Sequence, residues 1–186
     1  DYTIFAENNY PFIIDGSNYS NISKYIKGEK KVIIGATRRQ NNNFYNSFLL
    51  IEKDKIQYFD KKILVPFGEF LPLRKYLKFM DSISGTVDYK IGNIDRGLTT
   101  RDNINILPVI CYEIIFDQVF KNINKNKIDI IINITNDSWF GNKIGPYQHF
   151  YITRIKSLIS NRPLVRVSNN GISAIIDQNG KIIKYL

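Results

Sequence analysis

The chain has 186 residues, of which 44% are hydrophobic and 13% aromatic, enough to build a buried core and to exclude an intrinsically disordered protein. No run approaches the roughly 18 consecutive apolar residues that a membrane-spanning helix needs, so we expect no such helix here. The net charge of +9 favours anionic partners, either a membrane surface or nucleic acid, although the charge is spread evenly along the chain. One Cys and one His exclude an internal disulfide and any metal site built from several Cys or His ligands.

Short apolar, β-branched runs predict nine strands. They cover Tyr2–Phe5, Val32–Ala36, Phe44–Ile51, Lys55–Phe59, Ile104–Ile110, Ile128–Ile134, Leu164–Ser168, Ile172–Ile176 and Lys181–Tyr185. Strands that alternate with a few helical stretches, without repeats or linkers, predict one α/β domain over residues 1–186 with a mixed sheet. The chain opens and closes beside strand-like runs, so we expect it to be part of a longer protein.

Three stretches have helical patterns: Ser17–Lys27, Glu113–Asn122 and Pro146–Ser160. In the third, apolar positions are expected to share a core-facing side and two charged positions to face water. The apolar set is Phe150, Ile155, Leu158 and Ile159, and the charged pair is Arg154 and Lys156.

Cys111 is the most informative single residue. The apolar strand 104–110 runs directly into it, and the helix predicted over Glu113–Asn122 begins almost at once. A helix start carries unpaired N–H groups, which lower the pKa of a thiol and can bind a developing oxyanion. Cys111 is therefore a candidate nucleophile, and an inert buried cysteine is the alternative.

A thiol nucleophile also needs a base and a charge partner. Glu7 follows the first predicted strand, and Lys61 precedes a Pro-Phe-Gly-Glu loop that ends at Glu69. Glu113 lies two residues after the cysteine, and His149 is the one imidazole that could act as an alternative base. Each of these residues taken singly is compatible with an ordinary surface position.

The order Glu, Lys and Cys, with each residue at a strand end, resembles the catalytic triad of the nitrilase superfamily. Within it, five motifs resemble the apolipoprotein N-acyltransferase family along the whole chain. They are LVPFGEFLP at 64–72, CYE at 111–113, NDSWFG at 136–141, GPYQH at 145–149 and NRP at 161–163.

The resemblance implies a nitrilase-like α-β-β-α sandwich with mixed sheets, incomplete at its N-terminal edge, and no metal or cofactor. Membrane helices of full-length family members would lie outside the chain. It also implies site roles. These are nucleophile for Cys111, general base for Glu7, oxyanion-stabilising ammonium for Lys61, support for Glu69 and Glu113, and pocket lining for Tyr112 and Trp139.

The implied reaction moves an acyl chain from a phospholipid to the N-terminal amine of a diacylated lipoprotein through a Cys111 thioester. The resemblance also implies a periplasmic location on the bacterial inner membrane. The implied partner is a membrane surface and not a nucleic acid. We expect the isolated fragment to be inactive. One alternative is a soluble nitrilase-type amidase, which uses the same triad but admits water. The other is a non-catalytic basic module that binds membrane or nucleic acid. The motifs at 136–141 and 145–149 favour the transferase.

Overall fold

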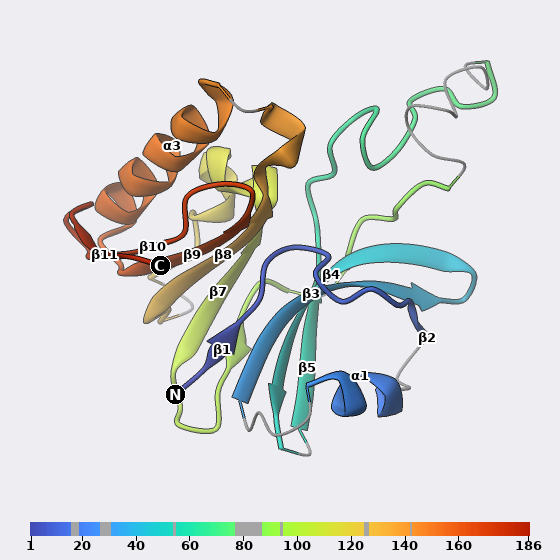
Figure 1. The fold of residues 1–186 in the computed structure, drawn as a ribbon, viewed down its shortest axis with the longest axis horizontal. Coiled ribbons are helices and arrows are strands. Elements are labelled where there is room, and N and C mark those ends of the chain that lie inside the picture. Colours follow the sequence, from blue (N-terminus) through green and yellow to red (C-terminus); the bar gives the residue numbers. More distant parts are fainter. Residues whose placement is uncertain are drawn as a thin grey trace.

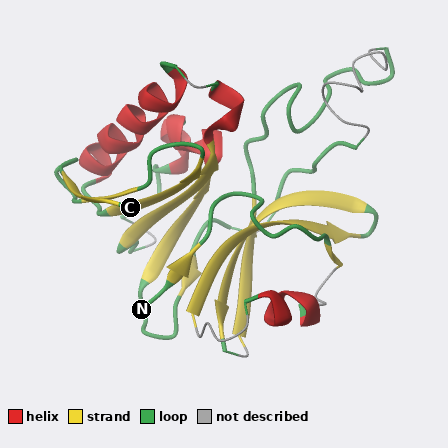
Figure 2. Cartoon of the chain, viewed as in Figure 1, coloured by secondary structure: helices red, strands yellow, loops and turns green. Residues whose placement is uncertain are grey.

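The computed structural model describes residues 1–15, 19–26, 31–53, 55–76, 87–93, 95–124, 127–141 and 143–186. Two sheets pack face to face, and helices cover their outer faces (Figures 1 and 2). The first sheet contains β1 (Thr3–Ile4), β2 (Ile14–Asp15), β3 (Lys31–Gln40), β4 (Asn43–Glu52) and β5 (Lys55–Asp60). The second contains β6 (Leu98–Thr99), β7 (Asn105–Ile110), β8 (Ile130–Asn136), β9 (Leu164–Asn169), β10 (Ala174–Ile176) and β11 (Ile182–Tyr185).

The first sheet is built on the long antiparallel pair of β3 and β4, with β5 beside β4 and the short β1 and β2 parallel to β3. In the second sheet the central strands β7, β8 and β9 are parallel, and antiparallel strands flank them. Parallel strands end at the same edge of a sheet, and ligands in α/β proteins bind beyond that edge. The segments that follow Ile110, Asn136 and Asn169 therefore meet at one side of the molecule.

Alternate residues along each strand pack on opposite faces, as the period of two requires. Ile33 and Phe48 of the first sheet lie between the sheets with Ile110 and Ile134 of the second. Their neighbours point outward to a second cluster under α1 (Ser20–Tyr25), and the outer face of the second sheet packs on α3 (Gly145–Ser160). These layers confirm the predicted α-β-β-α sandwich.

All nine predicted strands are present, with bounds shifted by a few residues, and among the described residues only the two-residue strands β2 and β6 were not predicted. The first predicted helix corresponds to α1, while residues 17, 18 and 27 lie outside the described residues. The α-helix predicted over Glu113–Asn122 is wrong. Two short 3₁₀ helices, Cys111–Ile115 (η2) and Asp117–Val119 (η3), replace it, because Phe116 between them is extended at φ −91° and ψ 122°.

The helix at α3 is confirmed, and Phe150 faces the core as predicted, but the rest of the predicted facing is wrong. Ile155, Leu158 and Ile159 are at least half exposed, and Lys156 is buried. The buried side carries polar groups that find partners on other elements: Lys156 pairs with Asp117, for example. Its members are Pro146, His149, Phe150, Thr153, Lys156, Ser157 and Ser160. Hydrogen-bonded polar groups can be buried without penalty, so hydrophobicity alone does not identify the inner face.

Candidate active site

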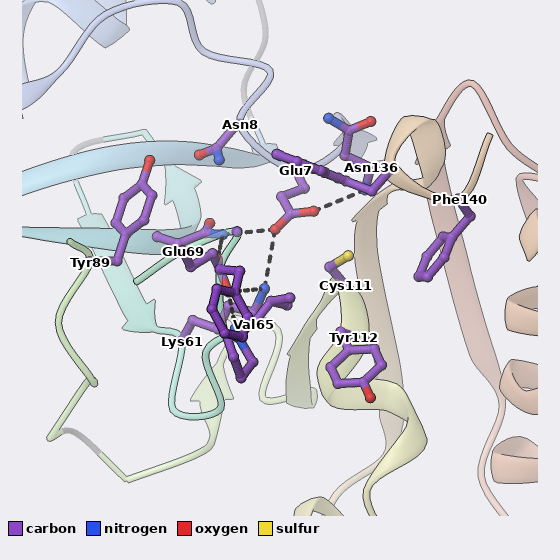
Figure 3. A pocket seen from close by; sticks show the side chains of 15 residues that line it. Glu7, Asn8, Lys61, Val65, Glu69, Tyr89, Cys111, Tyr112, Asn136 and Phe140 are labelled. Atoms are coloured by element: carbon purple, nitrogen blue, oxygen red, sulfur yellow. Dashed lines mark hydrogen bonds and ion pairs between the residues drawn. The ribbon is translucent and has the colours of Figure 1, made fainter. Parts of the chain in front are cut away.

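A cavity of about 570 Å³ opens where the loops after β1, β5, β7 and β8 meet (Figure 3). Six of the seven predicted site residues line it, and Glu113 alone lies behind it. The six are Glu7, Lys61, Glu69, Cys111, Tyr112 and Trp139. The fold therefore brings together residues that are more than 100 positions apart in the sequence.

Cys111 lies directly after β7 with φ at +49°, in the left-handed region that non-glycine residues rarely adopt. Strained positions of this kind persist where the surroundings hold them and cluster at functional sites. Burial, followed by the negative charge of Glu7, raises the pKa of the Cys111 thiol to about 12, while Lys61, the Thr135 hydroxyl and the Asn136 N–H act in the opposite direction. The expectation of a lowered thiol pKa is therefore wrong, because the 3₁₀ turn is short and the thiol is desolvated. The Cys111 thiol is therefore neutral near pH 7 and would need a base in order to act as a nucleophile.

Lys61 follows β5 and is almost fully buried, with its ammonium between two carboxylates. Its Nζ lies 2.9 Å from Glu69 Oε2 and 3.5 Å from Glu7 Oε1. Burial acts to lower the pKa of Lys61, but the charges of Glu7 and Glu69 outweigh it and hold the pKa above its usual range. Lys61 is therefore a permanent cation beside the thiol.

Glu7 reaches the site because the segment after β1 runs very close to β3. A Cβ atom at Gly35 would lie 2.7 Å from the Glu7 Cα, so only glycine permits this approach. The Glu7 carboxylate accepts hydrogen bonds from Asn46 Nδ2 at 2.7 Å and from the Asn136 N–H at 2.9 Å. Figure 3 shows Glu7 between Lys61, Asn136 and Cys111.

Asn46 is a site residue that the sequence reasoning missed. It lies in the middle of β4, is buried, and its Nδ2 donates to both Glu7 Oε1 and Glu69 Oε1 at 2.7 Å. Its backbone carbonyl also accepts from the Lys61 N–H at 2.8 Å. The available signal was a polar amide inside a strand that is otherwise largely apolar, because such a group must be paired when buried.

Glu113 supports the site from behind. Its carboxylate accepts two hydrogen bonds from Arg96 and one each from the backbone N–H groups of Lys62, Ile63 and Ile110. Burial would raise the pKa of Glu113, but the charge and hydrogen bonds of Arg96 outweigh it and lower the pKa. Glu113 thus ties the loop after Lys61 to the turn at the cysteine, and no sequence pattern indicated Arg96 as its partner.

The mouth of the cavity is aromatic. Tyr112 packs edge-on against Phe116 with ring centroids 5.2 Å apart, and Trp139 is 70% exposed beside Phe140. His149 does not line the cavity, because its Nδ1 lies 2.9 Å from a buried Asp137 oxygen. The structure therefore does not support His149 as the base for the thiol.

A carboxylate, an ammonium and a thiol that share one apolar cavity can carry out acyl transfer. The carboxylate can accept the thiol proton, and the ammonium together with backbone N–H groups can stabilise a tetrahedral oxyanion. This chemistry needs no metal or cofactor.

Comparison with known proteins agrees with this chemistry. Residues 26–186 match the family model described as carbon-nitrogen hydrolase. The chain is 45% identical over 144 residues to an apolipoprotein N-acyltransferase of Rickettsia typhi, which covers 76% of this chain and 29% of the relative. It is 40% identical over 172 residues to the apolipoprotein N-acyltransferase of Wigglesworthia glossinidia brevipalpis. This match covers 87% of this chain and 34% of the relative. The chain thus spans about a third of the length of these curated relatives.

Solved structures show the same fold. A CN-hydrolase superfamily protein of Xanthomonas campestris aligns at TM-score 0.72 and 17% identity, covering all of this chain and 73% of that one. A Saccharomyces cerevisiae member of branch 10 of the nitrilase superfamily aligns at TM-score 0.72 and 15% identity. The alignment covers all of this chain and 72% of the yeast protein. These alignments confirm the predicted nitrilase-like fold.

Proposed function

Because the chain belongs to the carbon-nitrogen hydrolase family, we propose that its Glu7–Lys61–Cys111 site transfers an acyl chain from a phospholipid to the N-terminal amine of a diacylated lipoprotein. The observation that carries this proposal is the Lys61 ammonium fixed between Glu7 and Glu69 in the cavity that Cys111 lines. The names of the curated relatives support the choice of substrates. Residues 1–186 would act as one catalytic unit on the periplasmic side of the inner membrane.

In the first half-reaction, Cys111 Sγ attacks the ester carbonyl of the phospholipid while Glu7 accepts the thiol proton. Lys61 and backbone N–H groups stabilise the tetrahedral oxyanion. The ester C–O bond then breaks, and Glu7 returns the proton to the departing lysophospholipid oxygen. The product is a thioester on Cys111.

In the second half-reaction, the lipoprotein amine attacks the thioester carbonyl and Glu7 accepts a proton from the nitrogen. The C–S bond breaks, and the proton passes to the departing sulfur, which regenerates the thiol. Glu69 holds Lys61 in place through both steps by its 2.9 Å ion pair. The route is ping-pong, with an amide as the final product.

The proposal is distinguished from amide hydrolysis by the fate of the acyl group. The full-length enzyme, given phospholipid and a peptide that carries a diacylated N-terminal Cys, should yield N-acyl peptide and little free fatty acid. Cys111→Ala should yield neither. Release of free fatty acid at the same rate with and without peptide would favour the amidase, and full activity of Cys111→Ala would favour a non-catalytic module.

We also propose that the cavity mouth lies against a membrane surface. No helix among the described residues is long and apolar enough to cross a membrane. Trp139, which lines the cavity, and Tyr147, in the first turn of α3, are both more than half exposed, and aromatic side chains of this kind suit a membrane interface. Basic residues near an anionic surface contribute roughly 1 kcal/mol each.

Sedimentation with liposomes tests this surface. The fraction of the chain that sediments should rise with anionic lipid content and fall as salt is added, because salt screens the attraction. Trp139→Ala should reduce binding at fixed charge, whereas Tyr185→Ala, at a similarly exposed ring on the edge strand β11, should not. If the sedimented fraction does not change with lipid charge, with salt or with Trp139→Ala, the proposed contact between the cavity mouth and a membrane is wrong.

A further inference from the structure

A buried ion pair lies directly behind the cavity. Asp137 and Arg166 are both fully buried, and Arg166 Nη2 donates to the two Asp137 carboxylate oxygens at 2.9 and 2.6 Å. Ser168 Oγ donates to the same carboxylate at 2.9 Å, and His149 Nδ1 lies 2.9 Å from it. A buried charge of this kind is tolerated only when it is paired and hydrogen-bonded throughout.

The surrounding residues leave this carboxylate no freedom to move. A Cβ atom at Gly171 would lie 2.0 Å from Asp137 Oδ2, so only glycine fits against it. Arg166 is fixed in turn by Asn133 Oδ1 at 2.6 Å and by Thr153 Oγ1 at 3.1 Å. Burial would raise the pKa of Asp137, but its hydrogen bond with His149 and the charge of Arg166 lower it to about 2, so the carboxylate stays ionised.

Asp137 is covalently joined to two parts of the site. On one side is Asn136, whose backbone N–H donates to Glu7 Oε2 at 2.9 Å. On the other side is the 3₁₀ helix η4 (Asp137–Phe140), which carries Trp139 and Phe140 at the cavity mouth. His149 also packs on Phe140, with ring centroids 5.0 Å apart. None of Asp137, Arg166 and His149 lines the cavity itself.

We propose that Asp137, held by Arg166 and His149, is the positioning residue that fixes the Asn136 N–H against Glu7 and so aligns the base with Cys111. The inference rests on the proposed acyl transfer. It assigns a role in that reaction to the Asp137 carboxylate, which does not line the cavity. A displacement near 1 Å at a reacting group can cost on the order of 100-fold in rate. Disturbing Asp137 should therefore slow the chemistry far more than it weakens substrate binding.

The test is Asp137→Asn in the full-length enzyme, with thioester formation on Cys111 followed against phospholipid concentration. The expected result is a kcat lower by on the order of 100-fold with KM changed less than about threefold, because the interaction lost acts on the reacting groups. Ser168→Ala removes one hydrogen bond to Asp137 and keeps the ion pair with Arg166, so kcat should fall by a smaller factor. If Asp137→Asn fails to fold, the Ser168→Ala variant still tests the inference.

Glu52→Gln is the matched control. Glu52 is equally buried and hydrogen-bonded, to the Tyr2 hydroxyl and the Arg101 N–H, but it lies at the far end of β4 from Asn46. It should lower the melting temperature and leave kcat within about twofold of the wild type. The inference is overturned if Ser168→Ala and Glu52→Gln lose the same amount of stability and also lower kcat by the same factor. A wild type that forms no thioester would instead overturn the proposed function.

Discussion

Lys61→Arg in the full-length enzyme should lower kcat almost as much as Lys61→Ala, by on the order of 1,000-fold, as expected when a donor to the oxyanion is lost. The ammonium is a compact point charge that fits between Glu7 Oε1 and Glu69 Oε2, whereas guanidinium is broad, planar and forked. Lys61 is 1% exposed and its Nζ contacts both carboxylates, so the larger group would have to displace Glu7 or Glu69. Steady-state acyl transfer with each variant measures the effect.

The neighbouring lysine is the control. Lys62 pairs only loosely with the fully exposed Asp95, at 3.8 Å, and its contact with Glu113 is through its backbone N–H, which a side-chain change preserves. Lys62→Ala should therefore retain kcat within about twofold, as exposed ion pairs contribute little. Loss of activity in Lys62→Ala with retention in Lys61→Ala would contradict the assignment of the site.

Glu7→Gln should reduce the rate of thioester formation by 1,000-fold or more, on the order expected for a general base that also positions the nucleophile. The pKa of Cys111 is raised to about 12 by burial and by Glu7, so almost no thiolate exists near neutral pH. Removing the Glu7 charge lowers the thiol pKa somewhat but leaves the proton without an acceptor. Single-turnover acylation measured between pH 6 and 9 separates these two effects.

For Glu7→Gln the residual rate should rise with pH, because hydroxide then replaces the missing base. Asp15→Asn, at an exposed carboxylate that pairs with Arg39, should behave like the wild type. A Glu7→Gln variant as fast as the wild type at pH 7 would show that the carboxylate is not the base.

The strands were predictable from sequence because the pattern that marks them is local. β3, β4, β7 and β8 are apolar runs whose residues are buried on both sides of a sheet, so their pattern depends on little else. Glu7, Lys61 and Cys111 follow β1, β5 and β7, and their lining of one cavity was expected from the resemblance of their order to a Glu-Lys-Cys triad, not from the strand pattern.

The remaining features depend on partners that are distant in sequence. The inner face of α3 is polar because Arg166, Asp117 and Asp177 offer partners, and no periodicity within the helix reveals them. The segment after Cys111 breaks at the extended Phe116, and Glu113 within it bonds to Arg96 and to the loop after Lys61, which are distant in sequence. The raised thiol pKa likewise follows from burial in the assembled cavity.

The most direct test of the account is the intact mass of the full-length enzyme after incubation with phospholipid and no acceptor. The aromatic mouth formed by Tyr112, Trp139 and Phe140 can exclude water, so an acyl-enzyme should persist until an amine arrives. We expect one added acyl mass that hydroxylamine removes, that Cys111→Ala lacks, and that a diacylated peptide discharges. Steady release of free fatty acid with no acylated protein at any time would contradict it.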